Sequence, residues 1–126
     1  MKRLTLLFIF SSMLVAQNLY FAAFKDIRQA TRIINTNPKK AQKLFIEASG
    51  YLKQIINTSI SNNKPSANAL NLLGKLYLNG WGVDKDEQKA YKLLCAAAKL
   101  GNSKAKKTLE KLNVKCQKIN FKELEQ

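Results

Sequence analysis

Hydrophobic residues recur at helical spacing along almost the whole chain, and strand-like alternation is absent. Apolar residues three and four positions apart share one face of an α-helix, as Phe24 and Ile27 do. Proline, which interrupts helices, occurs only at positions 38 and 65. The pattern therefore predicts five helices, at about residues 19–34, 38–58, 65–79, 84–100 and 103–112. The second helix could instead stop at Gly50, and either Asp84 or Asp86 could cap the fourth.

Short polar or glycine-rich breaks separate these helices. Asn37 precedes a proline and is therefore excluded from helical geometry, so the first helix ends before it. Gly101 stands where a left-handed residue commonly ends a helix. Short connections force antiparallel hairpins, and hairpins in series stack into a solenoid. The expected fold is therefore all-α, a short right-handed α/α solenoid, followed by a polar tail (residues 114–126) that frays at its end.

The first 16 residues have the features of a secretory signal peptide. Two basic residues precede an apolar run at positions 4–15, and Ala16 offers a small residue before a cleavage point. The run is shorter than the roughly 20 residues that cross a bilayer. Read as one segment as far as Phe24, however, it would form an uncleaved anchor. We expect a periplasmic or secreted bacterial protein, with an inner-membrane-anchored protein as the alternative.

The chain is strongly basic, with 22 Lys and Arg against 8 Asp and Glu. Such a charge favours anionic partners through long-range attraction, including acidic proteins, anionic lipids and cell-wall polymers. Nucleic acid is not expected, because an exported chain rarely meets it. Arginine, which suits phosphate recognition best, is also rare in this chain. The alternative is a solvated lysine surface without a specific partner.

The two cysteines, Cys95 and Cys116, would lie in an oxidising compartment if the chain is exported. An even number of cysteines there suggests a disulfide. A bond between them would contribute about 3 kcal/mol through loop entropy. The alternative is two independent thiols.

The stretch from Ala69 to Ala105 carries small and aromatic residues at characteristic intervals. In order these are Leu73-Gly74, Tyr77, Gly80-Trp81-Gly82-Val83, Asp86, Lys89-Ala90, Ala97-Ala98, Gly101 and Ala105. The pattern resembles the Sel1-like repeat, a relative of the tetratricopeptide repeat. The resemblance implies that these residues are repeat scaffold. The small residues let helices approach closely, Gly80 and Gly82 permit the tight link, and Tyr77 and Val83 fill the space beneath it.

A weaker copy lies earlier in the chain, where Lys40-Ala41, Leu44-Phe45 and Ala48-Ser49 align with the second half of the repeat. A third copy starts after Ala105 and fails, so the last helix would be a closing cap. The expected units are the signal (1–16), a degenerate hairpin (17–60), the repeat with its cap (61–113) and the tail. Some secreted family members pair cysteines at positions that match Ala98 and Ala105 here. A Cys95–Cys116 bond would instead require the tail to fold back.

Catalysis is not expected, because the chain has no histidine and its acids are scattered. Without histidine, the chain lacks the usual general base and the ligand of most zinc sites. The Ser-x-x-Lys motif of penicillin-recognising enzymes occurs twice, at residues 61–64 and 103–106, but its companion motifs are missing. We therefore expect no catalytic residue, cofactor, metal or small-molecule substrate.

Two features could bind a partner. Asn68, Asn71 and Lys75 fall at spacings of three and four, opposite the apolar face of their helix. In tetratricopeptide domains such residues often hold an extended peptide, and the alternative is a solvated face. Trp81 would be an exposed aromatic anchor between two glycines, or it would fold back on a hairpin. The leading hypothesis is an adaptor that binds an acidic envelope or periplasmic protein, and the competing one is a basic protein that binds anionic polymers or lipids.

Overall fold

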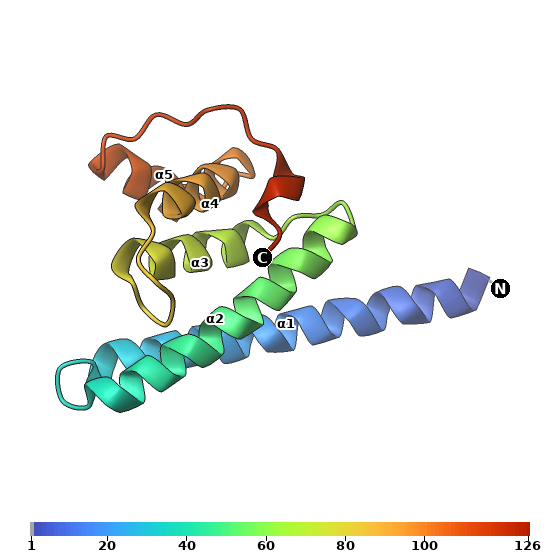
Figure 1. The fold of residues 1–126 in the computed structure, drawn as a ribbon. Coiled ribbons are helices and arrows are strands. Elements are labelled where there is room, and N and C mark those ends of the chain that lie inside the picture. Colours follow the sequence, from blue (N-terminus) through green and yellow to red (C-terminus); the bar gives the residue numbers. More distant parts are fainter. Residues whose placement is uncertain (1) are drawn as a thin grey trace.

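The computed structural model describes residues 2–126, and side chains from Leu14 onward. These residues form five α-helices and one short 3-10 helix, with no strand (Figure 1). The helices are α1 (Lys2–Ile33), α2 (Pro38–Ser61), α3 (Ala67–Asn79), α4 (Glu87–Lys99), α5 (Ser103–Lys111) and η1 (Phe121–Leu124). The all-helical prediction is therefore confirmed.

Each helix after α1 begins at a side chain that caps it. The side chains of Asn37, Ser66, Asp86 and Asn102 each accept a hydrogen bond from the main-chain N–H three residues on. These bonds satisfy donors that a helix start leaves without partners. Of the two acids considered for α4, Asp86 is the cap, and its Oδ1 lies 3.0 Å from the nitrogen of Lys89.

Two helices are longer than expected. α1 is continuous from Lys2, whereas the sequence predicted a helix from about residue 19. The predicted signal segment lies largely outside the described side chains, and its cleavage stays a prediction. Among the described residues, no helix is long and apolar enough to cross a membrane. α2 runs on through Gly50 to Ser61, so the glycine does not end the helix.

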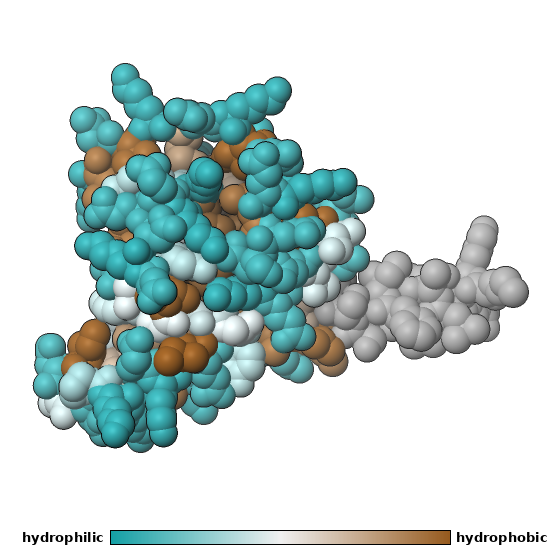
Figure 2. All heavy atoms as spheres, in the orientation of Figure 1, coloured by the Kyte–Doolittle hydropathy of each residue, from teal (hydrophilic) through white to brown (hydrophobic). Residues whose placement is uncertain are grey.

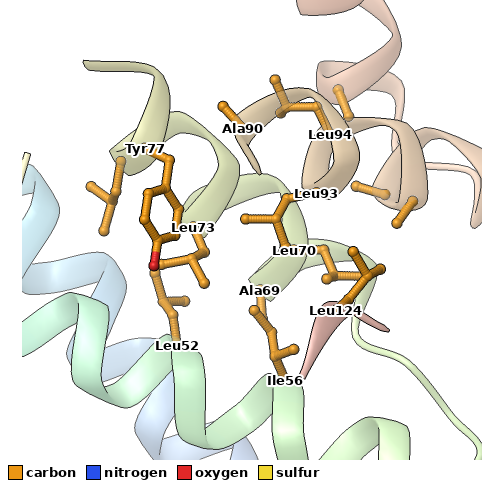
Figure 3. Close-up of a cluster of buried hydrophobic side chains, with 14 of the residues drawn as sticks. Leu52, Ile56, Ala69, Leu70, Leu73, Tyr77, Ala90, Leu93, Leu94 and Leu124 are labelled. Carbon is orange, nitrogen blue, oxygen red and sulfur yellow. The ribbon is translucent and has the colours of Figure 1, made fainter. Parts of the chain in front are cut away.

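The helices pair as two antiparallel hairpins that stack on each other. α1 packs on α2 and α3 packs on α4, while α2 meets α3 between the hairpins and α5 covers α4 (Figure 1). The core between them is aliphatic, with Leu70 and Leu73 of α3 fully buried beside Leu93 of α4 (Figure 3). An added Cβ on Gly74 would lie 2.9 Å from Cγ of Leu94, so the glycine lets α3 and α4 approach closely.

The tail folds back over the second hairpin, where the sequence predicted a frayed end. Cys95 of α4 and Cys116 form a disulfide, with their Cα atoms 5.6 Å apart. Beyond it the chain crosses α4 and ends near α2 and α3 (Figure 1). Leu124 is only 6% exposed and joins the core. The expectation of fraying was wrong because the disulfide, buried Leu124 and three half-buried apolar residues hold the segment against the core. These three residues are Val114, Ile119 and Phe121.

Candidate partner-binding surface

The predicted polar stripe of α3 faces α5. The Oδ1 atom of Asn68 accepts a hydrogen bond from Nδ2 of Asn102, the cap of α5, at 3.2 Å. We call the surface formed by five residues of these two helices the α3–α5 face. It consists of Asn68, Asn71, Lys75, Asn102 and Lys104.

Asn71 differs from its sequence-based description. The residue was expected on an open polar stripe, but only 3% of it is exposed. Its Oδ1 is buried and has no hydrogen-bond partner among the described residues. An unpaired polar atom in a protein interior costs about 1–3 kcal/mol. The burial follows from the tertiary arrangement, because neighbouring helices cover a position that an isolated α3 would leave in water.

Lys75 is half-buried on the same side of α3. Burial, and then repulsion from the ammonium of Lys104, lower the pKa of Lys75. Among the described side chains the structure has one ion pair, between Lys85 and Glu87, with Nζ and Oε1 3.8 Å apart. Neither lysine of the α3–α5 face therefore has an acidic partner, and an anion placed there would relieve the repulsion.

Trp81 does not project into solvent. Its ring stacks on that of Phe45 in α2, with centroids 4.9 Å apart and planes 15° apart. The neighbouring Gly82, at φ 72°, lies so close to α2 that an added Cβ would be 2.3 Å from the carbonyl carbon of Phe45. The link between α3 and α4 is thus clamped onto the preceding hairpin. This geometry favours the second of the two interpretations of Trp81, in which it folds back.

The residues assigned to the repeat scaffold mostly lie in the core. Those that are buried are Leu73, Gly74, Tyr77, Ala90, Ala97 and Ala105. Those that are half-buried are Gly80, Gly82, Val83 and Ala98, and Gly101 is exposed. Gly80 and Gly101 have positive φ angles of 66° and 97°, as the ends of α3 and α4 require. Nζ of Lys89 also lies 4.7 Å from the centroid of the Tyr77 ring, a cation–π contact between α3 and α4.

The sequence analysis missed the docking of the tail. The main chain of Gln126 pairs with the amide of Asn57 in α2: its N–H donates to Oδ1 at 2.7 Å, and its oxygen accepts from Nδ2 at 3.1 Å. The Tyr77 hydroxyl donates to Oε1 of Gln126 at 3.4 Å. The available signals were four apolar residues spread through an otherwise polar segment, Val114, Ile119, Phe121 and Leu124.

A shallow cavity of about 200 Å³ lies under the tail. Tyr91 and Lys92 of α4 line one side, and Ile119 and Glu123 of the tail line the other. No group of three or more His, Cys, Asp or Glu residues gathers there, or elsewhere among the described side chains, in a way that could hold a metal ion.

Comparison with known proteins identifies the architecture. The model of the Sel1 repeat matches residues 23–49 and 67–102, which together make up half of the chain. The chain has no significant match among curated proteins or among solved structures. The first match lies within the α1–α2 hairpin and the second spans the α3–α4 hairpin, so the weaker first copy predicted from the sequence is also confirmed. The chain belongs to the Sel1 repeat family.

Proposed function

We propose that this protein is a non-catalytic adaptor that binds an extended acidic segment of a partner protein on the α3–α5 face. Sel1 repeats mediate contacts between proteins, so a protein partner agrees with the family. The export signal expected from the sequence and the Cys95–Cys116 disulfide support a partner in the cell envelope or outside the cell.

The single observation that carries the proposal is a pair of neighbouring polar side chains on α3 that lack interaction partners. Asn71 holds an amide oxygen that has no partner, and Lys75, one turn on, is half-buried without an acid. Because Asn71 is only 3% exposed, binding would have to shift the side chains that cover it before a peptide main chain supplies a hydrogen-bond partner to the amide. Rotation of the amide exchanges its oxygen and nitrogen, so it can meet either a donor or an acceptor.

The charge of the face favours an acidic segment. Lys104 lies close enough to Lys75 to repel it, and the chain as a whole has a net charge of +14. A carboxylate between the two ammonium groups would form charge-assisted hydrogen bonds, which are stronger than neutral ones. We therefore infer that Asp or Glu side chains of the partner lie at this position.

A salt-series pull-down tests the proposal. The chain is immobilised, and extract of the cell envelope is applied at increasing salt up to about 0.3 M, where exposed charge interactions are largely screened. We expect a discrete protein to remain bound, and both Asn71→Leu and Lys75→Gln to lower its retention at least tenfold. The matched control is Lys43→Gln, which removes one positive charge from an exposed lysine on α2, outside the α3–α5 face. It should leave retention unchanged.

The competing function is general binding of anionic polymers or lipids by the lysine surface. Its specific support is α5, where all four lysines are exposed: Lys104, Lys106, Lys107 and Lys111. In the same experiment it predicts capture of many anionic species, complete release by about 0.3 M salt, and equal effects of Lys75→Gln and Lys43→Gln. That outcome would refute the adaptor proposal.

A further inference from the structure

The side of α1 that faces away from α2 carries an unpartnered row of aromatic and basic residues. Ala23 and Ala30 have no exposed surface and mark the inner side of the helix, against α2. The opposite side is open, and 69% of Phe21 and 37% of Phe24 are exposed. We call this row the outer stripe of α1. It consists of Phe21, Phe24, Lys25, Arg28 and Arg32.

The outer stripe is ordered before any partner binds. The ring of Phe24 stacks on that of Tyr20, with centroids 6.4 Å apart. The guanidinium of Arg28 lies over the Phe24 ring, 5.9 Å from its centroid. Contacts four residues apart on a helix hold such side chains in one direction. The row therefore presents aromatic rings at one end and positive charge at the other.

The single acid of α1 does not belong to this stripe. Oδ2 of Asp26 is buried without a hydrogen-bond partner among the described residues. Burial, followed by repulsion from Glu47 of α2, raises the pKa of this carboxyl. Asp26 therefore turns toward α2. Of the outer stripe, only Lys25 lies near enough to this carboxyl to lower its pKa in return, so Arg28 and Arg32 keep their positive charge unopposed.

We propose that the outer stripe of α1 is a site that binds the surface of an anionic lipid bilayer. The aromatic rings would enter the boundary between headgroups and acyl chains, while Arg28 and Arg32 would contact lipid phosphates. Aromatic residues favour this boundary, and basic residues on the same helix add attraction to anionic lipids. In Figure 2, hydrophobic atoms are uncovered beside the grey segment, and the exposed large hydrophobic residues in the described part of α1 are Leu14, Val15, Phe21 and Phe24.

Charge and chemistry distinguish the bilayer from other occupants. A second copy of the chain would bring two identical basic rows together on a protein of net charge +14, which repulsion opposes. A soluble anionic polymer would pair with the arginines but would offer no apolar phase to Phe21. The stripe lies entirely after Ala16, so cleavage of the predicted signal would leave it intact. The proposal is independent of the α3–α5 face.

Vesicle binding by the full chain tests this site. Vesicles of phosphatidylcholine alone are compared with vesicles that also contain phosphatidylglycerol. We expect Phe21→Ser to lower partitioning into the anionic vesicles about tenfold, because it removes a large apolar group that would enter the bilayer. The double variant Arg28→Gln/Arg32→Gln should lower it about fivefold per charge on anionic vesicles, and not at all on neutral ones. Leu112→Ser, at an apolar residue 41% exposed beyond α5, is the matched control.

A local probe keeps the test independent of the apolar run at positions 4–15. An environment-sensitive fluorophore is attached to a cysteine introduced by Phe21→Cys or, as control, by Leu112→Cys, while the native cysteines stay bonded. The emission at position 21 should shift to the blue on anionic vesicles, and the shift should weaken with the two arginine substitutions. The proposal is wrong if the arginine substitutions have no effect. The proposal is also wrong if the blue shift grows with protein concentration in the absence of vesicles. The same holds if the shift appears only when an acidic protein is added.

Discussion

At the scale of single residues, the joint between the two hairpins depends on a contact between main chains. Gly82 has φ 72°, and its α-carbon faces the peptide between Phe45 and Ile46 of α2. A side chain at this position would be strained by the backbone angle and would also collide with the main chain, which cannot move aside. Glycine is thus required at position 82 both by the close contact with α2 and by the positive φ angle of the link.

We expect Gly82→Ala to lower the free energy of unfolding by about 3 kcal/mol or more, because it adds left-handed strain and a backbone clash. Gly50→Ala is the matched control: it adds the same methyl group inside α2, where no atom lies within 4 Å. That change should raise stability by roughly 0.5–1 kcal/mol through helix propensity. Urea denaturation followed by circular dichroism measures both. Equal effects of the two substitutions would contradict the proposed contact.

Trp81 makes a second prediction at this scale. Because its ring stacks on Phe45, Trp81→Ala should lower the free energy of unfolding by about 2 kcal/mol, less than for a fully buried tryptophan. A double-mutant cycle with Phe45→Leu should give a coupling of about 1 kcal/mol. A binding anchor would behave in the opposite way, with unchanged stability and lost partner capture.

At the scale of elements, the tail acts as a strap across the second hairpin. It is attached at Cys116, at Leu124 and at Gln126, and residues 117–120, which follow the disulfide, have no regular structure. The contacts of Leu124 and Gln126 are each weak on their own. The disulfide keeps the end of the tail near its site and so raises its effective concentration there.

Reduction of the Cys95–Cys116 disulfide should therefore release the tail while α3 and α4 stay folded. We expect amides of η1 to lose their protection against hydrogen exchange, and the free energy of unfolding to fall by about 3 kcal/mol. Cys116→Ser without reductant should reproduce the effect. Leu124→Ala in the oxidised protein, which removes the buried side chain and keeps the bond, separates the contribution of the leucine. Unchanged exchange in η1 after reduction would show that the tail needs no tether.

At the scale of the whole molecule, two surfaces lie on different helices. The α3–α5 face belongs to the second hairpin and its cap, whereas the outer stripe belongs to α1, the first helix of the first hairpin. In Figure 1 the layers follow in the order α1, α2, α3, α4, so α1 and α5 lie at opposite ends of the stack. If both proposals hold, the protein would place an acidic partner at a membrane surface.

The two surfaces should work independently, because no contact joins them directly. We expect Lys75→Gln to leave vesicle partitioning unchanged, and Phe21→Ser to leave partner retention at about 0.3 M salt unchanged. Loss of both activities in either variant, without loss of helicity, would show that one surface serves both ligands.

Much of the fold could be predicted from the sequence because its signals are local. Asn37 before a proline, Asp86 before an amphipathic run, and Gly101 at a helix end each act within one turn. Asn37 and Gly101 were found where expected, and Asp86 was one of the two caps considered. The repeat was recognisable because its glycines and alanines keep fixed intervals. The candidate site was less predictable: Asn71 was expected in water, and the tail was expected to fray.

The sequence alone thus determined the helices, their ends, the hairpins and the repeat family, since spacing along one chain encodes which face each helix buries. Only the tertiary structure decided how the elements meet. It buried the Asn71 amide without a partner and stacked Trp81 on Phe45 of the preceding hairpin. It also inserted Leu124 into a core formed by helices more than 20 residues away. Each of these outcomes depends on a neighbour that is distant in sequence, and no local pattern specifies which neighbour that will be.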